Sequence, residues 1–319
     1  MVMQQVEKDT VVQFDVYTEE KSNSVADTTV VVIPCYNEER FIGSVVLKAR
    51  EYADYVIVVD DGSADATAAI ARSAGAIVVE HEKNSGKAIA MNTAFKKALE
   101  FDPKVVVAMD GDWQHMPEEL PVVSAPILND EADLVVGSRY LENTSEVPLK
   151  RIIGHWGLNA VINTLSGVTV TDSQSGFRAF SKLAVEKISF GSAGFTVESE
   201  MQFMAADHKL KVMEVPITIR YLDAPKRSVI KQGMQVLNGV LKLVSQHRPL
   251  LFFGVPGILS LLIGLGLGFA VMDSYQAGGS FPTLLTLGAA LLLINGTVAT
   301  FTGIILHTLR GYVVDYISR

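Results

Sequence analysis

The sequence is poor in cysteine: Cys35 is the single one among 319 residues. One thiol allows no intrachain disulfide and no cluster of thiolate metal ligands. Basic residues are outnumbered, because 27 lysines and arginines stand against 35 aspartates and glutamates, which gives a formal net charge of -8. A nucleic-acid-binding protein would show a basic footprint, so this balance argues against that class of partner.

An apolar stretch is missing from the first 28 residues, which mix charged and polar side chains. A secretory signal peptide needs an apolar core, so we do not interpret this segment as one. We predict that residues 1–28 form a flexible extension. The remaining length is enough for one sizeable domain and an appendage.

Charged residues are also absent from residues 249–272 and 274–309, on either side of Asp273. Each run exceeds the ~20 apolar residues with which a helix crosses a bilayer core. We therefore expect a transmembrane hairpin over residues 249–309, with spans at about Leu250–Met272 and Thr283–Leu306. Two adjacent uncharged runs of this length are atypical of a soluble core.

Lysine and arginine are missing from the short loop between the two expected spans, whereas both flanks carry them. The basic flanking residues are Lys226, Arg227, Lys231, Lys242 and Arg248 before the hairpin, and Arg310 and Arg319 after it. The positive-inside rule then places both termini, the N-terminal domain and a tail of residues 310–319 in the cytoplasm of a two-span membrane protein. Gly264, Gly268 and Asn295 could pack the hairpin or join subunits into a homo-oligomer.

Residues 29–140 alternate short β-branched runs with helical periodicity. We predict strands at 29–34, 55–59, 76–80, 105–109 and 132–137, with helices between them. This alternation predicts an α/β fold with a doubly wound, Rossmann-like sheet.

The pattern changes beyond Leu141. We predict a helix over 148–165, a polar loop over 171–181, a helix beginning within 194–201, and a strand over 213–221. Pro216 confines that strand to an edge of the sheet. Residues 229–248 predict an amphipathic juxtamembrane helix suited to the membrane surface, or else an ordinary domain helix.

The run Val105–His115, VVVAMDGDWQH, leads from a strand directly into two carboxylates. Ligands of open α/β sheets bind beyond the carboxyl ends of the strands. Asp110 and Asp112, spaced i, i+2 across Gly111, can turn towards one hard cation, which suits Mg²⁺ or Mn²⁺ shared with substrate phosphates. The alternative interpretation is a solvated acidic turn.

Other polar residues follow strands in the same way. Asp61 is placed to hydrogen-bond a ribose or a base, or else it shapes the turn. Lys87 lies in the first turn of a helix, where a cation opposes the dipole; a bound diphosphate would explain it, and a solvated lysine is the alternative. Asn37 and Ser63 are placed to cap the helices that follow them.

Six motifs occur in order: IPCYNEE, VVDDGSADAT, NSGK, DGDWQH, GSRY and DSQSGFR. Together they resemble the family 2 glycosyltransferases with the GT-A fold, and more narrowly the dolichol-phosphate mannosyltransferase-like group of dolichyl- and polyprenyl-phosphate sugar transferases. The resemblance covers about residues 29–248, with the GT-A catalytic domain at 29–228. The expected hairpin is similar to that of the members with two C-terminal spans.

The resemblance implies a role for each matching residue. The nucleotide sugar would contact Pro34, Tyr36, Asn37, Glu38, Val59, Asp61, Lys87, Asp110 and Gly111. The divalent metal, Mg²⁺ or Mn²⁺, would be held by Asp112, Gln114 and Asp110. The lipid phosphate would be bound by Arg139, Arg151 and His155, and the diphosphate would be covered by Arg220 and Lys226.

The sequence departs from the family pattern at two places. The loop RYLDAPKRS lacks the usual Gly-Ser-Lys form, which weakens the role of Lys226. Trp113 stands where the family has a small residue, which would tighten the sugar pocket.

The resemblance implies metal-dependent, inverting transfer of a sugar from a UDP- or GDP-sugar to a dolichyl or polyprenyl monophosphate. The Asn-Ser-Gly-Lys segment leans towards UDP-sugars. One alternative is transfer to a hydroxyl of a lipid-linked saccharide, with Asp172 as the base; another is a non-catalytic membrane scaffold. A processive synthase is disfavoured because the two tryptophans, Trp113 and Trp156, do not form its Gln-x-x-Arg-Trp motif.

Overall fold

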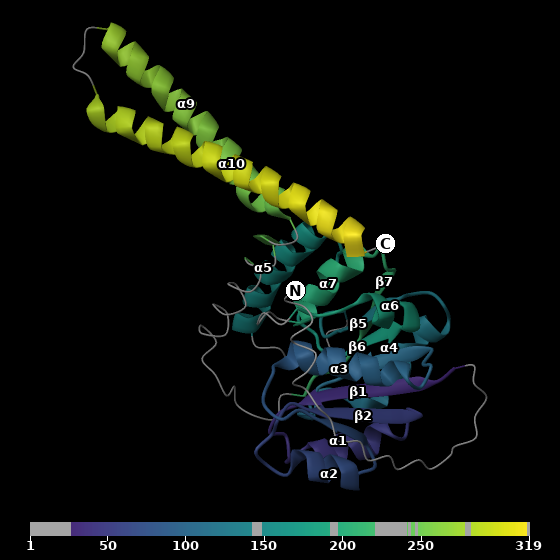
Figure 1. Ribbon diagram of the computed structural model, residues 1–319. Coiled ribbons are helices and arrows are strands. Elements are labelled where there is room, and N and C mark those ends of the chain that lie inside the picture. Colours follow the sequence, from purple (N-terminus) through teal and green to yellow (C-terminus); the bar gives the residue numbers. More distant parts are fainter. Residues whose placement is uncertain are drawn as a thin grey trace. The chain divides into compact units, whose positions relative to one another are not determined.

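The computed structural model describes residues 27–141, 149–191, 197–220, 241, 244–245, 248–277 and 282–317, with the side chains of 149–155 and 313–317 excepted. The chain divides into two compact units, Met1–Leu237 and Asn238–Arg319 (Figure 1). Most of the expected flexible extension and of the expected amphipathic helix, at 1–28 and 229–248, lies outside the described residues.

The first unit is built on one sheet with the strand order β3-β2-β1-β4-β6-β5-β7. Its strands are β1 (Thr29–Cys35), β2 (Tyr55–Asp60), β3 (Ile77–Glu80), β4 (Val105–Ala108), β5 (Leu134–Ser138), β6 (Arg178–Ser181) and β7 (Val212–Pro216). All neighbouring pairs are parallel except the two that involve β6. The predicted doubly wound sheet is confirmed, and β7 is the predicted edge strand.

Helices cover both faces of this sheet. They are α1 (Ile42–Ala49), α2 (Thr67–Ser73), α3 (Lys87–Leu99), α4 (Leu120–Leu128), α5 (Leu149–Ser166), α6 (Lys182–Lys187) and α7 (Val197–Asp207), with a 3₁₀ turn, η1 (Pro117–Glu119), before α4. Val31 and Ile33 pack with α1, α2 and α4 on one face, and Val30 and Val32 pack with α3 on the other. Strands that are buried on both faces have uninterrupted apolar runs, which is why these strands could be predicted.

The strand β6 was not predicted, since the sequence indicated a polar loop over 171–181. It lies between β4 and β5 and runs antiparallel to both. It has four residues, begins with the fully buried Arg178, and ends with the half-buried Ser181. Such a short run with an arginine carries no strand periodicity, and tertiary pairing decided its structure.

The two predicted helix caps were wrong. The first helix begins at Ile42 rather than after Asn37, whose backbone adopts a φ of 55°. The Asn37 side chain instead accepts a hydrogen bond from the Ala64 backbone (2.9 Å), and the Ser63 hydroxyl accepts one from the Asn37 backbone (2.8 Å). The two side chains therefore fasten the loops after β1 and β2 to each other.

The second unit contains a π-helical turn, η2 (Leu250–Gly254), followed by α9 (Val255–Gln276) and α10 (Thr283–Ile317). Two helices are long and apolar enough to cross a membrane, Leu250–Gln276 and Thr283–Tyr312. Most residues in the apolar part of each helix are not buried. Both begin where the sequence predicted the spans. The helix α10 also includes residues 310–317, which the sequence assigned to a tail.

Glycines let α9 and α10 approach closely along the hairpin (Figure 1). A Cβ added to Gly296 would lie 2.7 Å from the Gly257 carbonyl oxygen and 2.8 Å from the Leu261 backbone nitrogen. Gly264, noted in the sequence, packs on Leu293 in the same way. Small residues at helix contacts are typical of membrane helix pairs.

We expect Gly296→Val to lower the thermal unfolding midpoint of the detergent-solubilised protein. The added side chain overpacks the helix contact, which lowers stability by about 1–3 kcal/mol. Gly288→Val is the matched control, since it lies on the same helix and an added Cβ there meets no described atom within 4 Å. Equal midpoints for the two variants would contradict the proposed glycine packing.

Candidate functional site

The loop after β4 carries Asp110, which is joined to an ion-paired cluster. Lys87 Nζ donates to Asp110 Oδ1 at 2.7 Å and to Glu198 Oε1 at 2.8 Å. Burial acts to raise the pKa of Asp110, but the charge and hydrogen bond of Lys87 and the charge of Arg139 outweigh it and lower this pKa to about 2. Burial acts against the charged form of Lys87, but the two carboxylates raise its pKa above the usual range. Asp110 and Lys87 are therefore a carboxylate and an ammonium at neutral pH.

Asp112 lies beside this cluster without a cation of its own among its recorded contacts. The Gln114 backbone donates to its Oδ1 at 3.1 Å, and Gln114 Nε2 donates to its Oδ2 at 2.6 Å. Burial, and then the neighbouring charge of Asp110, raise the pKa of Asp112. A raised pKa means that the fold leaves negative charge here poorly compensated, and a bound cation would relieve it.

These residues fit a hard divalent cation. The described residues contain no group of three or more His, Cys, Asp or Glu side chains that would hold a metal alone. Magnesium-type sites use one or two carboxylates and fill the other positions with water and substrate phosphates. The carboxylates of Asp110 and Asp112, with the amide oxygen of Gln114, suit that kind of shared site.

His115 is buried beside the loop that carries Asp110 and Asp112 and accepts a hydrogen bond from it. It is 3% exposed, stacks on Phe177 with ring centroids 5.2 Å apart, and accepts a hydrogen bond from the Asp110 backbone at Nδ1 (3.1 Å). Burial lowers its pKa, so the ring is neutral at pH 7. Its position under the Asp-Gly-Asp turn makes it a residue that shapes the loop.

Gly176 brings a second loop against the same cluster. A Cβ added there would lie 2.8 Å from Asp110 Oδ2 and 3.3 Å from Lys87 Nζ. A side chain at this position requires either Asp110 or the loop of Gly176 to shift. The glycine of the DSQSGFR motif is therefore required by a close approach.

Asp61 and the other candidate nucleoside contacts surround the ends of β1 and β2. Asp61 is 3% exposed and accepts hydrogen bonds from the backbones of Ser85 (2.9 Å) and Gly86 (2.7 Å) and from His81 (2.8 Å). It thereby fixes the start of α3, where Lys87 lies. Pro34 and Val59 are buried, whereas Tyr36 is 45% exposed and available to a ligand.

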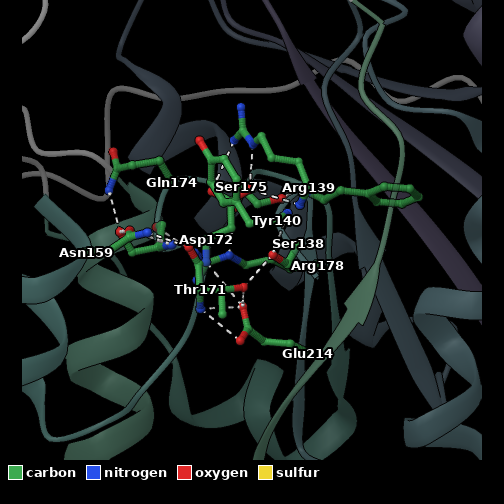
Figure 2. Close-up of polar contacts among 12 residues, drawn as sticks. Ser138, Arg139, Tyr140, Asn159, Thr171, Asp172, Gln174, Ser175, Arg178 and Glu214 are labelled. Atoms are coloured by element: carbon green, nitrogen blue, oxygen red, sulfur yellow. Dashed lines mark hydrogen bonds and ion pairs between the residues drawn. The ribbon is translucent and has the colours of Figure 1, made fainter. Parts of the chain in front are cut away.

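Arg139 follows β5 and is paired with Asp172. Its Nε donates to Asp172 Oδ2 at 2.5 Å and its Nη2 to Asp172 Oδ1 at 3.2 Å, so both carboxylate oxygens are engaged (Figure 2). The side chain of Asp172 is 1% exposed and that of Arg139 is 10% exposed. Two parallel N–H···O bonds of this kind fix the plane of a guanidinium.

The loop that carries Asp172 is held from several sides (Figure 2). Glu214 on β7 accepts hydrogen bonds from the Thr171 backbone (2.8 Å) and the Asp172 backbone (3.2 Å). Asn159 on α5 accepts one from the Ser173 backbone (3.0 Å). Arg178 donates to the carbonyl oxygens of Ser173 and Ser175, both at 2.9 Å. These contacts make the loop a rigid support for Arg139.

Arg178 is itself unusual, because it is a fully buried cation. Burial lowers its pKa, and the carboxylates of Glu198, Asp172 and Glu214 act in the opposite direction. Within the described part of the chain its Nη1 has no hydrogen-bond partner. The sequence indicated a polar loop over 171–181, which does not predict a buried position for Arg178.

The structure brings most of the predicted donor, metal and acceptor residues together. A cluster forms after the carboxyl end of β4 from Asp110, Gly111, Asp112 and Gln114, which Lys87 joins. The pair of Arg139 and Asp172 follows β5, close enough for the charge of Arg139 to act on Asp110. Arg220 is joined to the group by its backbone, which donates to the Gln114 carbonyl oxygen at 3.1 Å. The side chains of Arg151 and His155, and the whole of Lys226, lie outside the described residues.

The sequence of this chain is similar to those of known glycosyltransferases. The family model described as "Glycosyl transferase family 2" matches residues 30–189 of this chain. An uncharacterized protein of Methanocaldococcus jannaschii is 38% identical over 229 residues, which are 69% of this chain and 92% of that protein. A UDP-N-acetylglucosamine–dolichyl-phosphate N-acetylglucosaminyltransferase of Methanococcus voltae is 37% identical over 217 residues, covering 60% of this chain and 86% of the relative.

The fold also matches solved structures. Glucosyl-3-phosphoglycerate synthase of Mycobacterium tuberculosis, in complex with Mn²⁺, UDP and glucosyl-3-phosphoglycerate, superposes with a TM-score of 0.54 at 22% identity, over 74% of this chain and 88% of that one. At this identity the likeness concerns the GT-A fold. The sequence match covers the strands and loops that build the Asp110–Asp112 site and the Asp172 loop, and the chain therefore belongs to glycosyltransferase family 2.

Proposed function

We propose that this glycosyltransferase moves a sugar from a nucleoside diphosphate to the phosphate of a dolichyl or polyprenyl monophosphate at a membrane surface. The observation that carries this proposal is the pairing of an acidic centre, Asp110 and Asp112, with a buttressed arginine, Arg139, on one sheet edge. The name of the Methanococcus voltae relative and the two long apolar helices support the lipid acceptor.

The reaction needs two anions to meet at the anomeric carbon. An oxygen of the acceptor phosphate forms the new bond to that carbon, and the bond to the departing nucleoside diphosphate breaks, so the configuration inverts. A phosphate monoester has a second pKa of about 6 and is largely dianionic at neutral pH, so it attacks without a general base. Arg139 would position the acceptor phosphate through the planar fork of its guanidinium.

Asp110, Asp112 and Gln114 would hold Mg²⁺ or Mn²⁺ at the donor diphosphate. Such a cation, when bound, supplies positive charge to the leaving group. Lys87, which donates to Asp110, would add a second positive charge beside the same anion. Orientation by fixed charges in a partly buried site is the main contribution that a protein makes to such a transfer.

The membrane hairpin suits this acceptor, whose phosphate lies at the bilayer surface while its chain stays in lipid. Anchoring the catalytic unit at the membrane raises the effective concentration of the acceptor. The basic residues on both flanks of the hairpin favour a cytoplasmic catalytic unit. The lean towards a UDP-sugar donor follows from the Asn-Ser-Gly-Lys segment and from the name of the Methanococcus voltae relative.

A direct assay tests the proposal. Membranes with the expressed protein receive polyprenyl phosphate and a panel of radiolabelled UDP- and GDP-sugars, and the lipid extract is separated by chromatography. We expect one sugar to yield a lipid whose mass is that of the acceptor phosphate plus one sugar residue. Label found only on a lipid-linked saccharide would instead favour a hydroxyl acceptor.

We expect Asp172→Asn to lower turnover about 10- to 100-fold, because it releases Arg139. The KM for the acceptor should rise more than the KM for the donor. Both oxygens of Asp172 are engaged by Arg139, which suits positioning rather than proton abstraction. Losing one partner of a buried pair also lowers stability by about 3–5 kcal/mol. The measurement is the steady-state rate against each substrate concentration at a series of pH values. If Asp172 were the catalytic base, Asp172→Asn would instead remove the ascending limb of the pH profile and leave the KM for the acceptor unchanged.

A further inference from the structure

The strand order limits where the transferred sugar can lie, if the proposed function holds. The candidate nucleoside contacts lie at the ends of β1 and β2 and the acceptor arginine follows β5, and β4 and β6 lie between β1 and β5. In an inverting displacement the sugar lies between the leaving and the attacking oxygens. The sugar therefore lies beyond β4 and β6, where Asp110 meets Gly176.

Glu198 is an additional carboxylate at that place, to which neither the motifs nor the comparisons assign a role. It is the second residue of α7, and Lys87 joins it to Asp110 through contacts of 2.8 Å and 2.7 Å. Its side chain is 13% exposed. The helices α3 and α7 pack on the same face of the sheet, which brings their first turns together.

One oxygen of Glu198 is held and the other is open. Within the described part of the chain its hydrogen bond and ion pair use Oε1, which accepts from Lys87. The buried side-chain atoms without a partner there are Arg178 Nη1 and Gln202 Oε1, so Glu198 Oε2 is not sealed from solvent. An oriented carboxylate with one open oxygen is a strong acceptor for a hydroxyl group.

The charge of the cluster gives this acceptor a preference. Lys87 is shared by Asp110 and Glu198 and so balances only one of these two carboxylates, while the charge of Arg139 also acts on Asp110 and that of the buried Arg178 on Glu198. A donor sugar that carries its own carboxylate would meet a like charge at close range, which is unfavourable, whereas a neutral sugar would donate a hydroxyl hydrogen bond.

We propose that Glu198 selects the donor sugar: its Oε2 accepts a hydrogen bond from a hydroxyl of an uncharged hexose, and its charge excludes uronic acid donors. It acts on the sugar alone and leaves the nucleotide contacts unchanged. Glu198→Gln keeps the size of the side chain and an acceptor for Lys87 but removes the charge. Glu198→Asp keeps the charge but withdraws the oxygen.

Glu200 provides a matched control in the same helical turn. Its Oε1 accepts a hydrogen bond from the Gly191 backbone at 2.8 Å, whereas Glu198 Oε1 accepts from Lys87. Glu200→Gln removes the same charge two positions further along α7, and residues i and i+2 of a helix do not face the same side. Its effect measures any general influence of charge on the site.

The test is equilibrium binding of UDP, UDP-glucose and UDP-glucuronate to the purified full-length protein with Mn²⁺, by calorimetry. For Glu198→Gln we expect an unchanged Kd for UDP, about 10-fold weaker UDP-glucose binding, and a preference for UDP-glucose over UDP-glucuronate that falls about 10- to 100-fold. Glu198→Asp should weaken UDP-glucose and still reject UDP-glucuronate. Glu200→Gln should behave as the natural protein does.

Unchanged selectivity in Glu198→Gln, or an equal loss of UDP and UDP-glucose affinity, would overturn the role of Glu198 while the proposed function stands. If UDP does not bind, the same series is run with GDP, GDP-mannose and GDP-mannuronate. Failure of every nucleotide to bind the natural protein would overturn the proposed function itself.

Discussion

Asp112→Asn should reduce sugar transfer at least about 10³-fold, because the variant loses a ligand that a divalent cation needs at the leaving diphosphate, a contribution of about 4 kcal/mol or more. The fold should not suffer. The pKa of Asp112 is raised by burial and by Asp110, so the charged form is disfavoured in the folded protein. The neutral amide still accepts the hydrogen bond from the Gln114 backbone.

The measurement is initial rate against Mg²⁺ and Mn²⁺ concentration, together with the thermal unfolding midpoint. Removing divalent cations from the natural protein with a chelator should produce the same loss, and adding either cation should restore the rate. Asp102→Asn is the control, because Asp102 pairs with Lys182 and is 67% exposed, at a loop before β4 rather than after it. Near-normal transfer by Asp112→Asn would remove the metal role.

The sheet could be predicted from the sequence because its inner strands leave a continuous apolar signature. The runs that contain Val31, Val58 and Val106 are buried on both faces, and burial on both faces demands such residues. The hairpin helices could be predicted for the same reason, since length and missing charge alone define them. These features depend on composition over a window, which a sequence displays directly.

The site could be predicted only where its residues follow strands. Asp110 and Asp112 stand at a strand end, and the fold rule for ligand sites applies to them at once. Glu198 meets Lys87 across 111 residues, and nothing periodic announces such a contact. The burial of Arg178 could not be predicted because a charged residue is expected at the surface unless its partners are known.

The wrong helix caps have a similar cause. Asn37 and Ser63 carry the side chains that cap helices, and local chemistry favours that role. In the structure they bond to each other's loops, 26 and 27 residues apart along the chain. The contacts between the loops after β1 and β2 replace the local capping contacts. Such departures from local preference are common beside ligand sites.

Gly176→Ala should lower turnover about 100-fold with little loss of folding, the second large effect that we expect. The added methyl would lie 2.8 Å from Asp110 Oδ2, whose partner oxygen is held by Lys87 at 2.7 Å. The carboxylate has to turn or shift, and a misplacement of about 1 Å at a catalytic centre costs about 10²-fold. The φ of Gly176 is outside the left-handed region, so the effect comes from the contact and not from backbone strain.

Steady-state kinetics and thermal unfolding of Gly176→Ala separate these two sources. Gly157→Ala is the control: this glycine lies exposed on α5, an added Cβ meets no described atom within 4 Å, and the change should stabilise the helix by about 1 kcal/mol without altering turnover. If Asp110 is displaced, Gly176→Ala should also need more Mn²⁺ for half-maximal activity. An unaltered rate and Mn²⁺ requirement would mean that the Gly176 loop yields instead of Asp110, and that this close approach does not set the position of the carboxylate.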